Sequence, residues 1–428
     1  MNICMFTNTY LPQIGGVARS VASYAEDLRK MGHRVLIVAP TYAAEVPGEN
    51  EEEVLRVPAI QNFNGSDFSM RIAVPFLIAN TIDEFQPDII HSHHPYLLGD
   101  AAMRAARRRN LPLVFTHHTL YEQYTHYVPV KSDVMQQFVI NLSTKYANLC
   151  WLVVAPSESI ARLLRSRGVN VPIEEIPTGV DLEFFGSGDG ERFRRTHAID
   201  PDERVIGHVG RLAPEKNLCY LAEAVASFLS YHKGVFLIVG AGPSEKNIRQ
   251  IFHRHQLEKR LIMAGEHSGA YLADAYSAMD LFVFASKSET QGMVLTEAMA
   301  AGQSVVALDA SGVREVVTDG INGRLLDADA PSKLFAEAIY DFFQDPEQAR
   351  LFRREALKTA QTLSRESCAA RMAKVYELML RKKYKRGSGT PQDFLDLDKV
   401  VRSINIEWKL ISEKVAATVN ALIETTVK

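Results

Sequence analysis

Short apolar runs alternate with amphipathic stretches along most of the chain, and this alternation limits the possible folds more than any other feature. In the first half the runs include NICMFTN, HRVLIVAP, PDIIHSHH, PLVFTHH and CWLVVAPS, each brief and ended by Pro, Gly, Ser or Thr. The segments between several of them have helical spacing, and GVARSVASYAEDLRKMG ends at Gly32 as helices commonly do. Apolar strands separated by helices predict a parallel sheet that is covered on both faces.

The pattern lapses once and then begins again. Residues 182–204 combine Gly, Ser, charged residues and Pro201, which is typical of a connection between domains. RVIGHVG, GVFLIVGAG, LIMAGEH, LFVFAS and SVVALDA then form a second set of strands. The sequence therefore predicts an α/β protein with two Rossmann-like, doubly wound domains that face each other across a cleft, where ligands bind beyond the carboxyl ends of the strands.

The expected domains are residues 1–185 and residues 200–363. A helix over 364–382 is expected to cross back to the first domain, and a helical extension over 383–428 has no role that the sequence indicates.

Composition excludes several classes of protein. The 48 Lys and Arg residues are balanced by 51 Asp and Glu, so the formal net charge of -3 argues against a nucleic-acid partner. The four cysteines lie far apart without a CxxC pair, which fits a reducing compartment better than a disulfide framework. No run reaches the roughly 18 to 20 apolar residues of a spanning helix, and the N-terminus lacks the pattern of a signal peptide. We expect a cytoplasmic protein, with contact at the inner face of the membrane left open.

Two short motifs predict anion binding. In GRLAPEKN, Arg211 and Lys216 directly follow a predicted strand, and a guanidinium with an ammonium suits a diphosphate. In PQIGGV, Gly15 and Gly16 separate the first strand from the first helix, so that backbone N–H groups at the helix N-terminus are open to an anion. The alternatives are a solvated basic turn and an ordinary glycine turn.

Other motifs are weaker. Gly240 and Gly242 in VGAGP lack the third glycine and the following acid of a dinucleotide site, which argues against a dehydrogenase. The histidines of HSHHP and THHT lack carboxylates or cysteines at ligand spacing, so we expect hydrogen-bonding groups and no metal site.

The stretch SETQGMVLTEAMAAG places Glu289 and Glu297 eight positions apart around a predicted helix start. The backbone N–H groups of Gly292, Met293 and Val294 would face a phosphate, and the two carboxylates would accept hydrogen bonds from sugar hydroxyls. A glycosidase acid and nucleophile pair would leave the two cations of GRLAPEKN without a purpose. Two unremarkable acids at a helix start are the third interpretation.

RLAPEKN followed by SETQGMVLTEAMAAG resembles the retaining nucleotide-sugar glycosyltransferases of the GT-B fold, family four. The resemblance runs from Asn2 to about Leu380 and includes PQIGGV, HSHHPYLLG, THHT, PTGVDLEFF and VGAGP. It implies a hexosyltransferase that retains the anomeric configuration and needs neither a metal nor another cofactor.

The resemblance also implies a role for each matching residue. Arg211 and Lys216 would hold the diphosphate, Glu297 the ribose and Glu289 the transferred sugar. Gly292, Met293 and Val294 would bind the phosphate and sugar through their backbone, and Gly16 with Gly15 would close on the diphosphate. His118 would face the transferred sugar, and His117 would replace it if the alignment is shifted by one residue.

The acceptor is suggested by ETQG, where many relatives carry a Gly-Phe-Gly type loop, and by THHTLYEQYTHYVP. Together they resemble the branch that glycosylates diacylglycerol and related lipids, with UDP-glucose or UDP-galactose as the expected donor. Tyr121, Tyr124 and Tyr127 are expected to rest at a membrane interface, and MRAARRRN to contact anionic headgroups. The alternative for these residues is aromatic packing and a solvated helix end.

Other functions stay open. The acceptor could be a soluble sugar or a cell-surface polysaccharide precursor instead of a lipid. A sugar-nucleotide 2-epimerase and a non-catalytic sugar-nucleotide-binding protein are the remaining alternatives.

Overall fold

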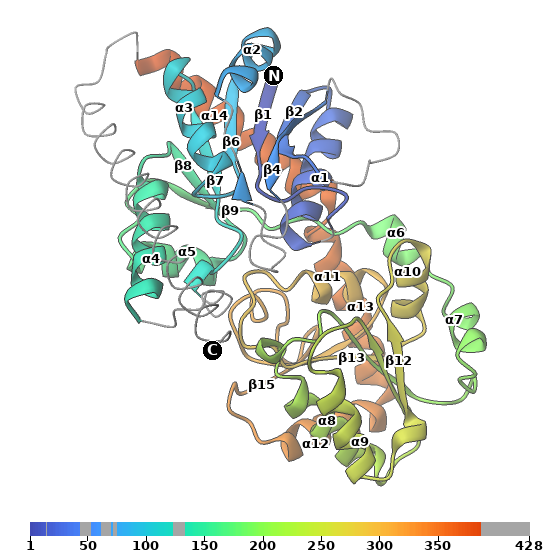
Figure 1. Ribbon diagram of the computed structural model, residues 1–428. Helices are drawn as coiled ribbons and strands as arrows, with labels where there is room; N and C mark the ends of the chain where they lie inside the picture. The colour runs from blue at the N-terminus through green and yellow to red at the C-terminus, as the bar shows by residue number, and fades with distance from the viewer. Residues whose placement is uncertain (14, 43–52, 61–69, 72–74, 123–132, 387–428) are drawn as a thin grey trace, which may run out of the picture. The chain divides into compact units, whose positions relative to one another are not determined.

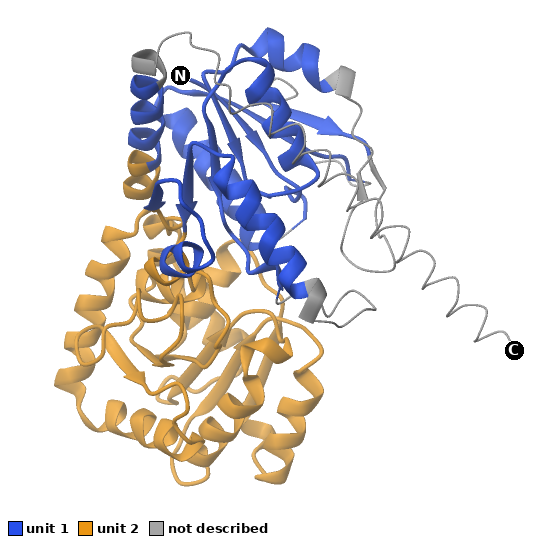
Figure 2. Cartoon of the chain, turned by 90° about the vertical axis from the view of Figure 1, so that its left-hand side faces the viewer, with its two compact units in different colours: residues 1–155, 161–174, 372–428 blue, residues 156–160, 175–371 orange. Residues whose placement is uncertain are grey.

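The computed structural model describes residues 1–13, 15–42, 53–60, 70–71, 75–122 and 133–386 (Figure 1). The chain forms two compact units, which Figure 2 shows in different colours. Unit 1 comprises residues 1–155, 161–174 and the described residues from 372 on, and unit 2 comprises residues 156–160 and 175–371. The domain boundaries expected from the sequence stay predictions.

Unit 1 contains a seven-stranded sheet in the order β3-β2-β1-β6-β7-β8-β9. Strand β1 pairs in parallel with β2 on one side and with β6 on the other, because the chain crosses over from the edge strand β3 to β6. A two-stranded antiparallel sheet joins β4 to β5. The strands are β1 (Asn2–Phe6), β2 (Arg34–Pro40), β3 (Val54–Val57), β4 (Ala59–Ile60), β5 (Met70–Arg71), β6 (Ile89–Ser92), β7 (Leu113–Thr116), β8 (Leu152–Ala155) and β9 (Ile173–Glu175).

Helices connect these strands, as the sequence predicts. They are α1 (Gly16–Lys30), α2 (Pro75–Phe85), α3 (Leu98–Arg108), α4 (Asp133–Asn148) and α5 (Glu158–Ser166). The central strands β6, β7 and β8 are buried along their whole length, which explains why they read as continuous apolar runs.

Unit 2 contains a six-stranded sheet in the order β12-β11-β10-β13-β14-β15, and all its strand pairs are parallel. Val235, Leu237 and Val239 of β11 pack into one hydrophobic cluster, and Phe236 and Ile238 pack into another. Successive side chains of a strand point to opposite faces, so both faces of this sheet are covered. The strands are β10 (Val205–Val209), β11 (Val235–Val239), β12 (Leu261–Gly265), β13 (Leu281–Phe284), β14 (Val305–Leu308) and β15 (Gly323–Leu326).

The helices of unit 2 contribute residues to these two hydrophobic clusters. Residues of α8 (Leu218–Leu229), α9 (Glu245–Arg254) and α12 (Ser332–Gln344) line one face, and residues of α10 (Ala270–Ser277) and α11 (Met293–Ala300) line the other. Helix α13 (Pro346–Thr362) supplies residues to both, and the short helices η3 (Pro214–Lys216) and η4 (Glu258–Arg260) follow β10 and α9. The prediction of two doubly wound α/β domains is confirmed.

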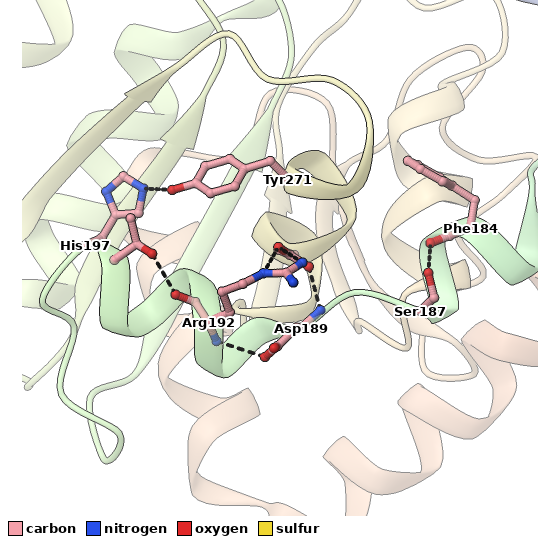
Figure 3. A network of polar contacts seen from close by, with 8 residues as sticks. Phe184, Ser187, Asp189, Arg192, His197 and Tyr271 are labelled. Atoms are coloured by element: carbon pink, nitrogen blue, oxygen red, sulfur yellow. Dashed lines mark hydrogen bonds and ion pairs between the residues drawn. The ribbon is translucent and has the colours of Figure 1, made fainter.

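The stretch 182–204, which the sequence predicts to be an irregular connection, forms two short helices within unit 2 (Figure 3). They are α6 (Leu182–Gly186) and α7 (Gly190–Thr196). The buried carboxylate of Asp274 in α10 accepts hydrogen bonds from the backbone N–H of Asp189 at 2.6 Å and from the Arg192 guanidinium at 2.5 Å. His197 lies beside Tyr271 of the same helix, with its Nε2 3.1 Å from the phenol oxygen. Apolar packing adds to these polar contacts, because Phe185 and Phe193 are buried and their rings lie 5.5 Å from Tyr276 and 5.1 Å from Tyr271 of α10.

Helix α14 (Arg365–Arg386) begins in unit 2 and continues into unit 1 from Met372. In unit 1 it contributes Tyr376, which is completely buried. Among the helices that the structure describes, none combines the length and apolar character needed to cross a bilayer.

Candidate active site

Two loops at the same edge of the unit 2 sheet bring Lys216 and Glu289 together. β10 and β13 are neighbours, so the loops after their carboxyl ends lie side by side. Lys216 ends the turn η3, and Asn217 follows it in the left-handed conformation and donates to the Ala285 carbonyl beyond β13 at 3.3 Å. The Lys216 ammonium forms an ion pair with the Glu289 carboxylate, and both side chains are largely buried. The structure thus joins the two motifs that the sequence singled out.

Arg211 lies in the same loop as Lys216, one residue after Gly210. Its guanidinium pairs with the carboxylate of Glu215, a residue that the sequence argument did not select, and its side chain is about half exposed at 46%. A guanidinium fork that binds a carboxylate also matches the oxygens of a phosphate. Arg211 therefore presents an accessible cation in the loop that ends at Lys216.

The segment that contains the glycines of VGAGP packs directly against the loop that carries Arg211. The backbone N–H of Leu212 donates to Ala241 O at 2.8 Å, and Ser244 N–H donates to Leu212 O at 2.8 Å. A Cβ at Gly240 would lie 1.9 Å from Gly210 O, and one at Gly242 would lie 2.5 Å from Leu212 O. These glycines allow two backbones to touch, which accounts for them without a dinucleotide.

Side chains distant in sequence fix the loop that carries Glu289. The Gln291 amide accepts from Thr178 N–H at 2.8 Å and donates to Thr178 O at 2.7 Å. Ser157 Oγ donates to Thr290 O at 2.7 Å. Gly292 has φ of 72°, and a Cβ there would lie 2.7 Å from Gly312 O. The sequence argument did not identify Gln291, Ser157 or Thr178, and their spacing carries no local signal.

Helix α11 begins directly after Gly292, which makes no side-chain cap. Met293 and Val294 form its first turn and are partly exposed, as an N-terminus that meets an anion requires. Glu297 lies one turn further along and is 5% exposed. The buried hydroxyl of Tyr276 donates to its Oε2 at 2.7 Å. The two acids therefore have different surroundings: Glu289 pairs with a cation, and Glu297 with a phenol.

His208 of β10 is a further buried polar group near these loops. Its Nδ1 lies 3.1 Å from Val283 O, and its Nε2 has no hydrogen-bond partner among the described residues. Burial lowers its pKa to about 4; the Lys216 charge lowers it further, while the Val283 carbonyl and the Glu289 carboxylate oppose the shift. The imidazole is therefore neutral at physiological pH.

In unit 1, Gly15 and Gly16 form the start of α1. Gly15 is the N-cap with an extended φ of -173°, and no acid lies in the first turn to offset the positive end of the helix dipole. Both glycines are exposed, and a Cβ at either would meet no atom of the described residues within 4 Å. Anion binding at Gly15 and Gly16 stays a prediction.

The histidines of HSHHP and THHT gather at the carboxyl ends of β6 and β7. His91 is held by Thr116 Oγ1 at 2.7 Å and by the Tyr376 hydroxyl at 2.6 Å. His93 Nδ1 lies 2.9 Å from His118 Nε2. Both ring nitrogens of His117 are buried and have no hydrogen-bond partner in the described part of the chain.

Burial makes this histidine cluster neutral. It lowers the pKa of His91 and His118 to about 3, that of His117 to about 4, and that of His93 well below the usual value. Repulsion between neighbouring histidines adds to the effect for His91, His93 and His118. Within the described residues no group of three or more His, Cys, Asp or Glu is placed to hold a metal ion.

Of the three tyrosines expected at an interface, Tyr121 alone lies among the described residues. Its ring packs edge-on against Tyr96 at 5.3 Å and against His117 at 5.7 Å, and its hydroxyl is buried. Burial raises its pKa well above the usual value. Tyr124 and Tyr127 lie outside the described residues. In MRAARRRN, Arg109 pairs with Asp83 at 2.6 Å, so this side chain already has an acidic partner.

Comparisons with known proteins relate the chain to glycosyltransferases. Residues 14–184 match the family described as Glycosyltransferase Family 4, and residues 189–359 match the one described as Glycosyl transferases group 1. The chain is 29% identical over 331 residues to the alpha-monoglucosyldiacylglycerol synthase of Streptococcus pneumoniae, which covers 76% of this chain and 75% of that relative. It is 31% identical over 340 residues to the GDP-mannose-dependent alpha-mannosyltransferase of Mycolicibacterium smegmatis. This match covers 77% of this chain and 85% of that relative.

The fold has relatives among solved structures as well. The crystal structure of Anabaena HepE in complex with UDP matches with a TM-score of 0.71 and 21% identity, over 88% of this chain and 100% of HepE. The chain is therefore a hexosyltransferase that has the GT-B fold and belongs to glycosyltransferase family 4.

Proposed function

We propose that the protein transfers a hexose, with retention of its anomeric configuration, from UDP-glucose or UDP-galactose to a hydroxyl of diacylglycerol or a related lipid. The observation that carries the proposal is the Lys216–Glu289 ion pair, with Arg211 in the same loop as Lys216 and with α11 beginning at Met293, shortly after Glu289. One edge of one sheet thus offers cations for a diphosphate and a carboxylate for sugar hydroxyls. The S. pneumoniae relative is named for glucosyl transfer to diacylglycerol.

Each residue receives a role toward the donor. Arg211, Lys216 and the N–H groups of Gly292, Met293 and Val294 bind the diphosphate, together with Gly15 and Gly16 of unit 1. Glu297 accepts from the ribose hydroxyls and Glu289 from the sugar. His118 contacts the transferred sugar as a neutral group, because its lowered pKa rules out a charged imidazolium at physiological pH.

In the proposed reaction the bond between the anomeric carbon and the diphosphate oxygen breaks, and the acceptor oxygen forms a new bond on the same face of the sugar. The acceptor proton passes to a phosphate oxygen. Arg211, Lys216 and the helix N-termini stabilise the charge that develops on the leaving diphosphate. We propose that these groups act without a metal ion, and that the acceptor brings the protein to the membrane surface.

A second candidate is transfer of mannose from GDP-mannose to a soluble sugar or a polysaccharide precursor. It is favoured by the 31% identity to a GDP-mannose-dependent mannosyltransferase. The donor diphosphate and the sugar hydroxyls are common to both candidates, so the residues assigned above serve either one.

Labelled UDP-glucose, UDP-galactose and GDP-mannose should be incubated with the full chain, with and without vesicles that contain diacylglycerol. We expect label to enter the lipid from a UDP-sugar, at a rate that EDTA leaves unchanged. Transfer from GDP-mannose to a soluble sugar would establish the second candidate instead. An epimerised nucleotide sugar, or no turnover with any donor and acceptor, would overturn the assignment as a lipid hexosyltransferase.

A further inference from the structure

His93 and His118 come from neighbouring strands of unit 1. β6 and β7 pair in parallel, with Ser92 opposite Phe115, so the residues after their carboxyl ends emerge at one edge of the sheet. The His93 backbone N–H still donates to Phe6 O at 2.9 Å, and the His117 N–H to Val154 O at 2.9 Å. Both loop starts are therefore tied to the strands beside them, and the two side chains leave from fixed backbone.

The two imidazoles touch in two ways. His93 Nδ1 lies 2.9 Å from His118 Nε2, and the rings stack with centroids 5.2 Å apart and planes 24° from parallel. The exposed fractions differ: His93 is completely buried, whereas His118 keeps part of its surface open. His118 is thus the member of the pair that can meet a ligand, and His93 lies behind it.

His93 is itself held from its other side. The His91 ring lies 4.1 Å from the His93 ring, tilted by 33°. His91 is fixed through both of its nitrogens by Thr116 and Tyr376. His93 therefore sits between an anchored ring and His118, with little freedom to turn.

One proton lies between His93 Nδ1 and His118 Nε2, because both rings are neutral. If His118 donated it, His93 would carry its own proton on Nε2, which is buried and has no hydrogen-bond partner among the described residues. Buried donors without a partner are rarer than buried acceptors without one, so we assign the proton to His93 Nδ1. His118 then accepts at Nε2 and carries its proton on Nδ1.

We propose that His93 is a positioning residue for sugar transfer: it fixes the ring of His118 and its tautomer, so that His118 offers an Nδ1–H donor to an oxygen of the transferred sugar. This inference rests on the proposed function, in which His118 contacts that sugar. His93 touches no substrate in this scheme and acts only through His118.

Three substitutions of His93 separate positioning from packing. In His93→Asn the side-chain amide takes the place of Nδ1 and keeps a partner for His118, whereas in His93→Gln the amide lies near Nε2, and His93→Leu has no polar atom. We expect kcat to fall roughly 10- to 100-fold in the Leu and Gln variants, with the donor KM changed less, and to be largely restored in the Asn variant. His94→Asn changes the next residue of the loop, whose Nδ1 accepts from Asn8 N–H at 3.0 Å, and should leave kcat near the wild-type value.

Imidazole nitrogen NMR tests the same inference without turnover, which separates its failure from failure of the proposed function. In the wild-type protein we expect neutral His118 with its proton on Nδ1, and in His93→Leu a shift toward the Nε2–H form. A wild-type His118 protonated on Nε2 would overturn the proposal. A wild-type kcat in His93→Leu, or equal losses of kcat in the Asn and Gln variants, would also overturn it. If the Leu variant does not fold, the comparison of the Asn and Gln variants decides between positioning and packing.

Discussion

The side-chain amide of Gln291 exchanges two hydrogen bonds with the backbone of Thr178, at 2.7 and 2.8 Å, although 113 residues separate them. Both groups are buried. The contact fixes the backbone between Glu289 and the start of α11, so the position of a proposed sugar-binding carboxylate depends on a residue that itself binds no sugar.

Replacement of Gln291 by Ala should therefore affect stability and activity together. The substitution removes both hydrogen bonds that the Gln291 side chain makes with the Thr178 backbone, which should lower the free energy of unfolding by about 1 to 3 kcal/mol. The loosened loop should also lower kcat. Urea unfolding and initial rates measure both, with the exposed Gln250→Ala as the control; equal stability of the two variants would contradict this account.

Loss of either member of the Lys216–Glu289 pair should reduce turnover more than stability. We expect Lys216→Ala and Glu289→Ala each to lower kcat/KM roughly 100- to 1,000-fold, because each removes a group that contacts the donor in the transition state. Lys287→Ala is a matched control, since Lys287 forms an exposed ion pair with Asp329 in the same unit. Near wild-type rates in either site variant, measured on protein with an unchanged melting transition, would remove the assigned roles.

Helix α10 offers a matched pair of tyrosines. Tyr276→Phe removes the hydroxyl that donates to Glu297, whereas Tyr271→Phe removes one that lies beside His197. We expect the Tyr276 variant to bind the nucleoside diphosphate more weakly, because the Glu297 carboxylate loses the contact that orients it. Calorimetric titration with UDP and GDP decides the point, and equal affinities for the two variants would show that Tyr276 does not orient Glu297.

The buried histidines predict that acid destabilises the fold well above the range where carboxylates titrate. Burial holds the pKa of His91, His117, His118 and His208 at about 3 to 4. Below about pH 6.5 the unfolded chain binds protons that the folded chain does not, so the free energy of unfolding falls as pH falls toward those values. Each histidine contributes at most about 1.4 kcal/mol per pH unit.

Asp100 acts in the opposite direction. Burial raises its pKa to about 6, so below that pH the folded chain binds a proton that the unfolded chain binds only near pH 4. One carboxyl cannot offset four imidazoles. Urea unfolding at pH 7.5, 6 and 5 should therefore show a steady loss of stability, and a constant free energy of unfolding over this range would contradict the prediction.

Sequence patterns predicted the strands and the sites at their ends for a physical reason. A strand buried on both faces must be continuously apolar, and polar side chains directly after it lie at the edge where ligands bind. This logic found Arg211, Lys216 and Glu289. The Lys216–Glu289 ion pair depends on β10 and β13 being neighbours, which the sequence did not predict. The Glu215 partner of Arg211 was not predicted either, since an acid four residues away is typical of a solvated surface.

The contacts between Gln291 and Thr178, Tyr276 and Glu297, and His93 and His118 were beyond the sequence argument. Each joins loops or helices whose distance apart is set by the packing of the whole unit. The two helices in 182–204 were missed for another reason. Asp181 and Asp189 cap them by accepting from the backbone N–H of Phe184 and Arg192, but acids among glycines and serines are equally typical of a loop.

Helix α14 supplies Tyr376 to a sheet whose strands all lie within the first 175 residues, and Tyr376 contacts His91, which lies 285 residues upstream. During synthesis, the ribosome must therefore complete the whole of unit 2 before unit 1 receives its last buried helix. Until then, nascent unit 1 lacks the tyrosine that contacts the His91 imidazole. A fragment that ends before Met372 would lack the part of α14 that belongs to unit 1.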